Sequence, residues 1–200
     1  MYRWGNILLS DINWINTEIR CPLISKKDDT QLGYYLAGII EADGSIIIPK
    51  NNSKNTPTIS ISFNIQDKPL ALCIKNRLGY GFLENIEIKN AVRLVIRGRY
   101  NIMSLVSLIN GKFRTPKIEN LHKLINYINQ NWLKVKENFI SIKSVDTTIL
   151  NDNSWLAGFS DGDANLNINI TWPDKAKNGY GQIRLTFELV QSRIDNDHFI

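Results

Sequence analysis

The feature that most constrains the fold of this chain is a short peptide that occurs twice. Residues 36–44 read LAGIIEADG, and residues 156–164 read LAGFSDGDA. In each copy an apolar helical stretch ends in a pair of acids, and two strand-like segments follow. Because the same order of elements restarts, the pattern is typical of an internal repeat, and we expect two related lobes.

The hydrophobic pattern predicts the elements of each lobe. Residues 30–43 carry apolar side chains at helical spacing, and Gly44 follows as a stop signal. After this helix we expect a hairpin, a helix with Asp67 as its N-cap and Gly79 at its end, a second strand pair and two helices. After the second copy, a helix over 151–163, only two strands follow, over 164–172 and 183–191.

These elements predict an α+β fold of duplicated αββαββα lobes, with helices on one face of antiparallel sheets and an incomplete second lobe. The expected divisions are a lead segment or linker at 1–27, a first lobe at 28–145 and the truncated beginning of a second lobe at 146–200. We expect the 200-residue chain to be a fragment or a degenerate product.

Small residues define one face of each repeated helix. Gly38 and Ala42 lie four residues apart, as do Gly158 and Gly162. Residues at this spacing share a helix face, and small side chains there let two backbones approach closely. We therefore expect the two helices to pair along a pseudo-twofold axis and to form the interface between the lobes.

The acids Asp43 and Asp163 end these helices, where the negative pole of the helix macrodipole disfavours a carboxylate. Parallel pairing of the helices would also bring the two carboxylates together, and close carboxylates repel each other. A divalent cation such as Mg²⁺, which binds oxygen ligands, removes both costs. A single acid in this place is ordinarily a solvated surface residue, but its duplication behind a small-residue seam favours a metal site.

The predicted strands have one apolar and one polar face. Such alternation is also found in any half-exposed antiparallel sheet. Beside the paired acids, however, Ser, Thr, Asn, Gln and Arg side chains on several strands favour contact with the base edges of DNA. The candidate DNA-binding residues are Ser60, Ser62, Gln66, Arg93, Arg99, Asn165, Asn167, Asn169, Arg184 and Thr186.

Composition narrows the class of protein. The formal net charge of +5 favours a polyanionic partner, and two histidines are too few for a histidine-based metal centre of the His-Asn-His type. No apolar run approaches the roughly 20 residues of a membrane span, so no membrane association is expected. The 30 Ile and 24 Asn have AT-rich codons and indicate an AT-biased genome such as a mitochondrial one.

At these residues the sequence resembles the LAGLIDADG family of homing endonucleases and intron maturases, which are often encoded within organellar introns. Both repeated peptides match the family signature, ISFNIQD and INGKFRTPK between them are also similar, and the resemblance covers about residues 30–192. It implies a saddle of two antiparallel sheets over duplex DNA, a catalytic site under the paired helices and, at full length, a pseudo-symmetric monomer.

The resemblance also implies roles for individual residues. The acid at the eighth motif position binds the catalytic divalent cation, here Asp43 and Asp163, while Glu41 and Asp161 would cap helix ends or support the site. The remaining catalytic candidates are two residues that order solvent and one basic residue near the end of the fourth strand, namely Asn64, Glu188 and Arg97, with Arg99 as the alternative to Arg97.

Three functions follow from this resemblance. The leading one is a Mg²⁺-dependent endonuclease that cuts double-stranded DNA at an intron insertion site. The second is an RNA maturase that assists splicing of its host group I intron by binding the intron RNA. The third is a DNA-binding regulator without catalysis, and the presence of both acids in this sequence argues against it.

Overall fold

The computed structural model describes residues 29–50, 55–133, 135–172 and 181–189. Its elements are α1 (Asp29–Asp43), β1 (Gly44–Ile47), β2 (Thr58–Asn64), η2 (Ile65–Asp67), α2 (Lys68–Leu78), β3 (Phe82–Ile86), η3 (Glu87–Lys89), β4 (Ala91–Arg97), α3 (Arg99–Ile109), α4 (Ile118–Asn131), η4 (Lys136–Asn138), α5 (Trp155–Asp163), β5 (Ala164–Thr171) and β6 (Gln182–Leu189). The predicted α+β order is confirmed. None of the helices in the described part of the chain has the length and apolarity needed to cross a bilayer.

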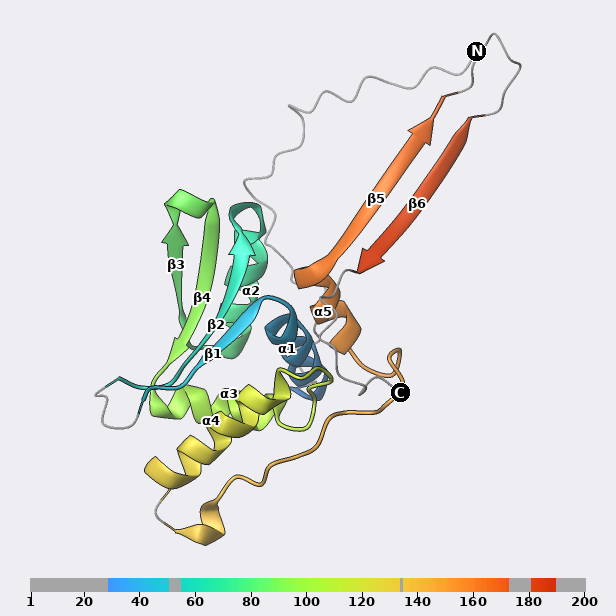
Figure 1. The fold of residues 1–200 in the computed structure, drawn as a ribbon. Coiled ribbons are helices and arrows are strands. Elements are labelled where there is room, and N and C mark those ends of the chain that lie inside the picture. The colour runs from blue at the N-terminus through green and yellow to red at the C-terminus, as the bar shows by residue number, and fades with distance from the viewer. Residues whose placement is uncertain (1–28, 51–54, 134, 173–180, 190–200) are drawn as a thin grey trace.

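The first lobe is an antiparallel sheet with strand order β1-β2-β4-β3, packed against helices (Figure 1). Alternate side chains of β2 and β4 form the centre of the core, among them Ile61 and Leu94, which are paired across the two strands and fully buried. Helix α1 adds Leu36 and Ile40 to the same core. This is the period-2 and period-3.6 packing that the sequence predicts.

Helix α1 ends where the sequence places its stop signal. A Cβ atom added to Gly44 would lie 2.5 Å from the Ile40 Cα and carbonyl oxygen, so only glycine fits directly after Asp43. The second copy has Ala164 in the equivalent place, and there the chain leaves α5 in an extended conformation with φ −90° and ψ 150°. The two helix ends therefore turn into their strands differently.

Three predicted boundaries were wrong. Strand β2 ends at Asn64, whose Oδ1 accepts a hydrogen bond from the Gln66 N–H, so Gln66 lies in η2 and not on the polar face of a strand. Strand β4 ends at Arg97 because Gly98 has a φ of 91°, which turns the chain and makes Arg99 the first residue of α3. Helix α5 begins at Trp155, after a turn, and not at residue 151.

The ends of α2 test two further predictions. Asp67 is the N-cap residue of α2 but makes no side-chain cap hydrogen bond. At the other end Gly79 adopts a left-handed conformation with φ 78°, and its N–H donates to the Lys75 carbonyl. The predicted C-terminal signal is therefore confirmed, and the N-terminal position is correct without its hydrogen bond.

The segment 135–154 connects α4 to α5 and lies against the first lobe. Asn129 donates to and accepts from the backbone of Ile140, at 3.0 and 2.9 Å. Asn110 donates to the Ser141 carbonyl at 2.8 Å. Because asparagine offers a donor and an acceptor together, it can hold an extended segment that has no sheet partner. The connection is thus fixed before it enters α5.

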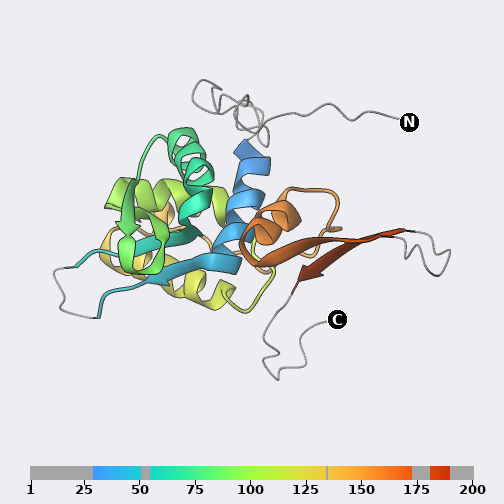
Figure 2. The ribbon, with the colours of Figure 1, turned by 90° about the horizontal axis from the view of Figure 1, so that it is seen from above.

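The two strands after α5 form a separate antiparallel pair that projects away from the four-stranded sheet (Figures 1 and 2). Their register places Leu166, Ile168 and Ile170 directly opposite Phe187, Leu185 and Ile183. This apolar face is exposed, with Leu185 at 74% and Phe187 at 53%. Among the described residues, the apolar face of this strand pair is therefore left uncovered.

Candidate active site

Helices α1 and α5 pack side by side and parallel through their small residues. A Cβ atom added to Gly38 would lie 2.1 Å from the Trp155 carbonyl oxygen, and one added to Gly158 would lie 2.0 Å from the Tyr35 carbonyl oxygen. Both obstacles are backbone atoms, which cannot move aside as a flexible side chain can. The four residues expected at the interface, Gly38, Ala42, Gly158 and Gly162, all lie in this contact.

Parallel pairing brings the C-terminal ends of both helices, and hence Asp43 and Asp163, to one place. An ideal Cβ on Gly162 would lie 3.6 Å from Asp43 Oδ2, so the Asp43 carboxylate borders the opposite helix. Burial raises the pKa of Asp43, the negative charge of Asp163 raises it further, and the nearby Lys117 lowers it. The structure thus brings together the two acids for which the sequence predicts a shared site.

This pair of carboxylates fits a divalent cation. Within the described ranges no three or more His, Cys, Asp or Glu side chains gather in a group that could hold a metal ion. Two oxygen-donating carboxylates suit Mg²⁺, which is commonly held by one or two protein carboxylates together with water and substrate phosphates. The mutual repulsion of Asp43 and Asp163 is the cost that such a cation would remove.

Lys117 is a site residue that its local sequence does not point to. Its Nζ donates hydrogen bonds of 3.1 Å to the carbonyl oxygens of Ile40, Ala42 and Gly44. These contacts satisfy carbonyls at the end of α1 and the start of β1, and they place a cation at the negative pole of the helix. Burial lowers the pKa of Lys117, while the charges of Glu41, Asp163 and Asp43 oppose that shift.

The sequence signal for Lys117 is the segment INGKFRTPK, which ends at this lysine and resembles the family. Nothing in the local pattern shows that the last lysine of this segment reaches back to α1. The ammonium group is held by three acceptors, so its position beside the acids is fixed.

Glu41 holds the surroundings of Lys117 in place. Glu41 is 5% exposed, and its carboxylate accepts hydrogen bonds from the backbone N–H groups of Arg114 and Thr115 and from the Thr115 hydroxyl. The Trp155 indole N–H donates to the same carboxylate at 2.6 Å. Burial raises the pKa of Glu41 although these hydrogen bonds lower it. Glu41 therefore joins α1, the turn before α4, and α5.

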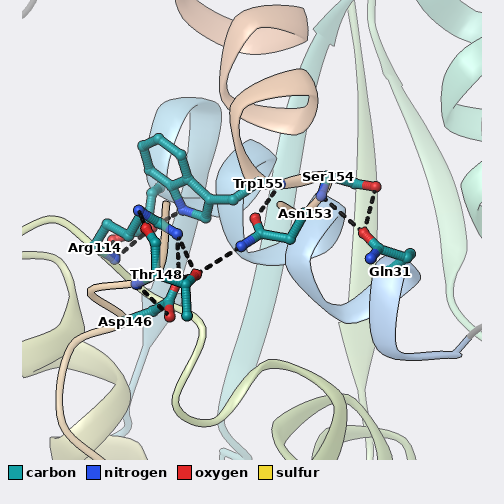
Figure 3. Close-up of polar contacts among 8 residues, drawn as sticks. Gln31, Arg114, Asp146, Thr148, Asn153, Ser154 and Trp155 are labelled. Atoms are coloured by element: carbon teal, nitrogen blue, oxygen red, sulfur yellow. Dashed lines mark hydrogen bonds and ion pairs between the residues drawn. The ribbon is translucent and has the colours of Figure 1, made fainter. Parts of the chain in front are cut away.

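A second polar network fixes the start of α5 (Figure 3). Arg114 donates to the carbonyl and hydroxyl oxygens of Thr148 and forms an ion pair with Asp146. The Ser154 N–H and hydroxyl both donate to Gln31 Oε1 at 2.9 Å, which ties the residue before α5 to the first turn of α1. These contacts orient α5 as it begins.

The structure does not bring Arg97 or Arg99 to the acid pair. Arg97 pairs with Thr58, which in turn pairs with Ile47 at the far end of β1. Gly44, which follows Asp43, is at the opposite end of β1, so Arg97 lies away from the acid pair. The Arg97 guanidinium lies 5.5 Å from the Phe82 ring centroid, toward the outer edge of the sheet. The Arg99 side chain donates to the Trp132 carbonyl at the end of α4.

Asn64 and Glu188 do not occupy equivalent positions in the two lobes. Asn64 lies three positions beyond Ile61, the partner of Gly44, and its Oδ1 accepts from the Gln66 N–H. In the second lobe Ala164 pairs with Leu189. Glu188 directly precedes Leu189 and pairs with Asn165. The phenylalanines that precede them in sequence match, but the strands that carry them pair in different registers.

The remaining candidates lie on the sheets of the two lobes. In the first lobe Ser62 pairs with Arg93, but Ser60 is only 7% exposed and pairs with Val95, which is also buried, so Ser60 does not lie on an open polar face. In the second lobe the register places five candidates on one face of the strand pair, with Asn165 opposite Glu188, Asn167 opposite Thr186 and Asn169 opposite Arg184.

Comparison with known proteins agrees with this arrangement. Residues 36–128 match the family described as LAGLIDADG endonuclease. The Schizosaccharomyces pombe "Uncharacterized cox1 intron-2 37.2 kDa protein" is 35% identical over 192 residues, which cover 93% of this chain and 54% of that protein. The Saccharomyces cerevisiae "Intron-encoded DNA endonuclease aI3" is 37% identical over 153 residues, which cover 70% of this chain and 37% of that protein.

This chain belongs to the LAGLIDADG family. The chain spans about half or less of the length of these relatives. Among solved structures, the LAGLIDADG meganuclease I-AabMI bound to uncleaved DNA has a TM-score of 0.51 at 24% identity, covering 80% of this chain and 66% of that chain. The I-SmaMI homing endonuclease bound to cleaved DNA has a TM-score of 0.51 at 18% identity, with the same coverage. At these identities the structures establish the LAGLIDADG fold.

Proposed function

We propose that this chain is part of a site-specific endonuclease that cuts double-stranded DNA at an intron insertion site. The observation that carries the proposal is the pair Asp43 and Asp163 at the meeting ends of two parallel helices, beside the fixed ammonium of Lys117. Intron-encoded relatives, one named a DNA endonuclease, support this function.

The residues of the site suit hydrolysis of a phosphodiester. When bound between the acids, a Mg²⁺ ion would supply a reactive water and stabilise the leaving oxygen. Asp43 and Asp163 would hold the cation by oxygen atoms from both lobes. Lys117 keeps its ammonium beside them, where it reduces the net negative charge that a phosphate must approach. Each helix end contributes one acid, which suits a cut in each DNA strand.

The polar sheet faces would read the target. Ser62 and Arg93 in the first lobe, and the Asn165–Asn167–Asn169 row in the second, offer donors and acceptors for base edges in the major groove. The net charge of +5 favours association with the phosphate backbone. The catalytic assignments of Asn64, Glu188 and Arg97 remain predictions.

A second function is supported by one specific relative. The Saccharomyces cerevisiae "Intron-encoded RNA maturase bI4" is 26% identical over 145 residues, which cover 72% of this chain and 20% of that protein. We propose assistance in splicing of a host group I intron as the alternative. In either case the gene would lie in an organellar intron, in agreement with the abundance of Ile and Asn, and the protein would act in the mitochondrion.

The test is cleavage of the intronless exon junction with Mg²⁺ by the product of the complete reading frame that carries this sequence. We expect Asp43→Asn to abolish cleavage of both strands while DNA binding survives, because the metal site is separate from the sheet faces. Asp152→Asn, the same substitution at an exposed turn residue, is the matched control. Cleavage by Asp43→Asn within about tenfold of the wild-type rate, roughly 1.4 kcal/mol of barrier, would refute the assignment.

The same proteins separate endonuclease from maturase. The maturase alternative predicts that the Asp43→Asn variant still promotes splicing of a precursor RNA carrying the host intron. Absence of DNA cleavage by the wild-type protein, together with splicing of that RNA, would replace the endonuclease by the maturase.

A further inference from the structure

Two hydrogen bonds cross the α1–α5 contact in a reciprocal way. Tyr35, directly before the Leu of the first motif, donates its hydroxyl to Asp161 Oδ2 of the second helix at 2.7 Å. Trp155, directly before the Leu of the second motif, donates its indole N–H to Glu41 Oε2 of the first helix at 2.6 Å. The acceptors Glu41 and Asp161 occupy the same position of their motifs, two residues before the acids of the site.

The glycine contact by itself does not define how far one helix is shifted along the other. Small residues let two backbones approach closely, and this kind of contact has no directional requirement of its own. A hydrogen bond is more demanding, since it weakens steeply outside a narrow range of distance and angle. One residue of helix rise, about 1.5 Å, is enough to break such a bond.

The two bonds act in opposite directions. Tyr35 lies near the middle of α1 and Trp155 at the start of α5, and each donates to a residue nearer the C-terminal end of the other helix. If α5 moves along α1 toward its own C-terminus, the Tyr35–Asp161 bond lengthens and the Trp155–Glu41 bond is compressed. Movement the other way reverses the two effects. Together the bonds therefore allow only one axial position.

We propose that Tyr35 and Trp155 are positioning residues, which fix the axial register of α1 against α5 and thereby the separation of the Asp43 and Asp163 carboxylates. The inference rests on the proposed metal site at these acids. Each acceptor precedes an acid by two residues on the same helix, so the register set at the acceptors is carried to the acids. Tyr35 is 1% and Trp155 7% exposed, so water does not replace these bonds readily.

The two acceptor carboxylates differ in environment. Glu41 is buried, whereas Asp161 is exposed and can take a water molecule if the Tyr35 hydroxyl is removed. Loss of the Trp155 donor therefore disturbs the contact more than loss of the Tyr35 hydroxyl. Since either bond alone still opposes movement in one direction, loss of both has a larger effect than the separate effects combined.

The first test needs no metal. Nitroxide labels at exposed positions 119 on α4 and 171 on β5 report the distance between the lobes in wild type, Tyr35→Phe, Trp155→Phe and the double variant. Tyr34→Phe and Trp132→Phe are the matched controls, because neither residue donates across the helix contact. We expect the distance distribution to broaden clearly in the double variant and only slightly in each single variant. A double variant with the wild-type distribution would overturn the proposal.

The second test measures the site itself. Mn²⁺ binding to the full-length protein in complex with target DNA is followed by calorimetry, with DNA affinity measured separately without metal. We expect Mn²⁺ affinity in the double variant to fall about tenfold or more, with DNA affinity unchanged. Replacing residues that orient metal ligands typically has an effect of this size. Lower thermal stability with unchanged Mn²⁺ affinity would show a purely structural role and refute the proposal. If Asp43→Asn also leaves Mn²⁺ affinity unchanged, the proposed metal site fails, and the metal-free distances alone decide the register.

Discussion

Replacement of Glu41 by glutamine tests whether this buried carboxylate holds together α1, the turn before α4, and α5. In the native protein Oε1 accepts from the Arg114 N–H, the Thr115 N–H and the Thr115 hydroxyl, and Oε2 accepts from Arg114 and from the Trp155 indole. Glutamine keeps one acceptor oxygen and replaces the other by an NH₂ group, which cannot accept. Of the two orientations, the better one keeps the oxygen toward Thr115 and turns the amide toward Trp155.

The expected magnitude follows from the donor left without a partner. The Trp155 indole N–H is then buried against another donor, which costs about 1–3 kcal/mol. The remaining bonds lose their charge assistance, and hydrogen bonds to a carboxylate are roughly twice as strong as neutral ones. Against this, burial raises the pKa of Glu41, so a neutral side chain recovers part of the desolvation cost. We expect Glu41→Gln to lower the free energy of unfolding by about 2–4 kcal/mol.

The assay is urea unfolding of the metal-free protein at pH 7, with Glu119→Gln on the exposed face of α4 as the matched control. We expect the midpoint to fall with the slope unchanged, because the same surface is exposed on unfolding. A loss below about 0.5 kcal/mol, no more than an ordinary surface substitution, would show that Glu41 does not hold these elements together.

Three further outcomes follow from the site. Gly38→Leu or Gly158→Leu should separate α1 from α5 and lower thermal stability, because backbone atoms lie about 2 Å from the new Cβ; an unchanged melting temperature with normal cleavage would contradict the glycine contact. Lys117→Met keeps the aliphatic stem but removes three hydrogen bonds to the end of α1 and the start of β1, so DNA cleavage should fall at least tenfold, and wild-type kinetics would rule out a role at the site. Burial and Asp163 raise the pKa of Asp43, so the folded protein holds this proton more tightly than the unfolded chain, and metal-free stability from this group is present below pH about 4 and is lost as pH rises through the raised pKa. Measured by urea unfolding at pH 4–8, the free energy of unfolding should decline less with pH in Asp43→Asn than in the wild-type protein. An equal decline in both proteins would contradict this expectation.

Much of the fold follows from the sequence because the relevant forces are local. The period of the apolar residues defines α1 and α4, and alternation defines β2 and β4. Gly44 and Gly79 end their helices where a side chain has no room or the backbone must turn left-handed. The duplicated motif, with its small residues and its acids, also predicts that two helices pair and that two carboxylates meet.

What the sequence misses depends on contacts between distant segments. Nothing near Lys117 shows that its ammonium reaches the end of α1, since that contact depends on how the turn before α4 is held by Glu41. The donors of Tyr35 and Trp155 look like ordinary core aromatics until the second helix supplies an acceptor for one and the first helix for the other.

Strand register is a further feature that the sequence does not predict. Matching the phenylalanines before Asn64 and Glu188 makes these two residues look equivalent, yet their strands pair in different registers. The sequence by itself determined which residues form helices, which faces are apolar and which acids are paired, because spacing along one chain decides these features. Only the tertiary structure decided which lysine lies beside the acids and which residues hold the helices in register, because hydrogen bonds between segments far apart in sequence depend on the relative positions of whole elements.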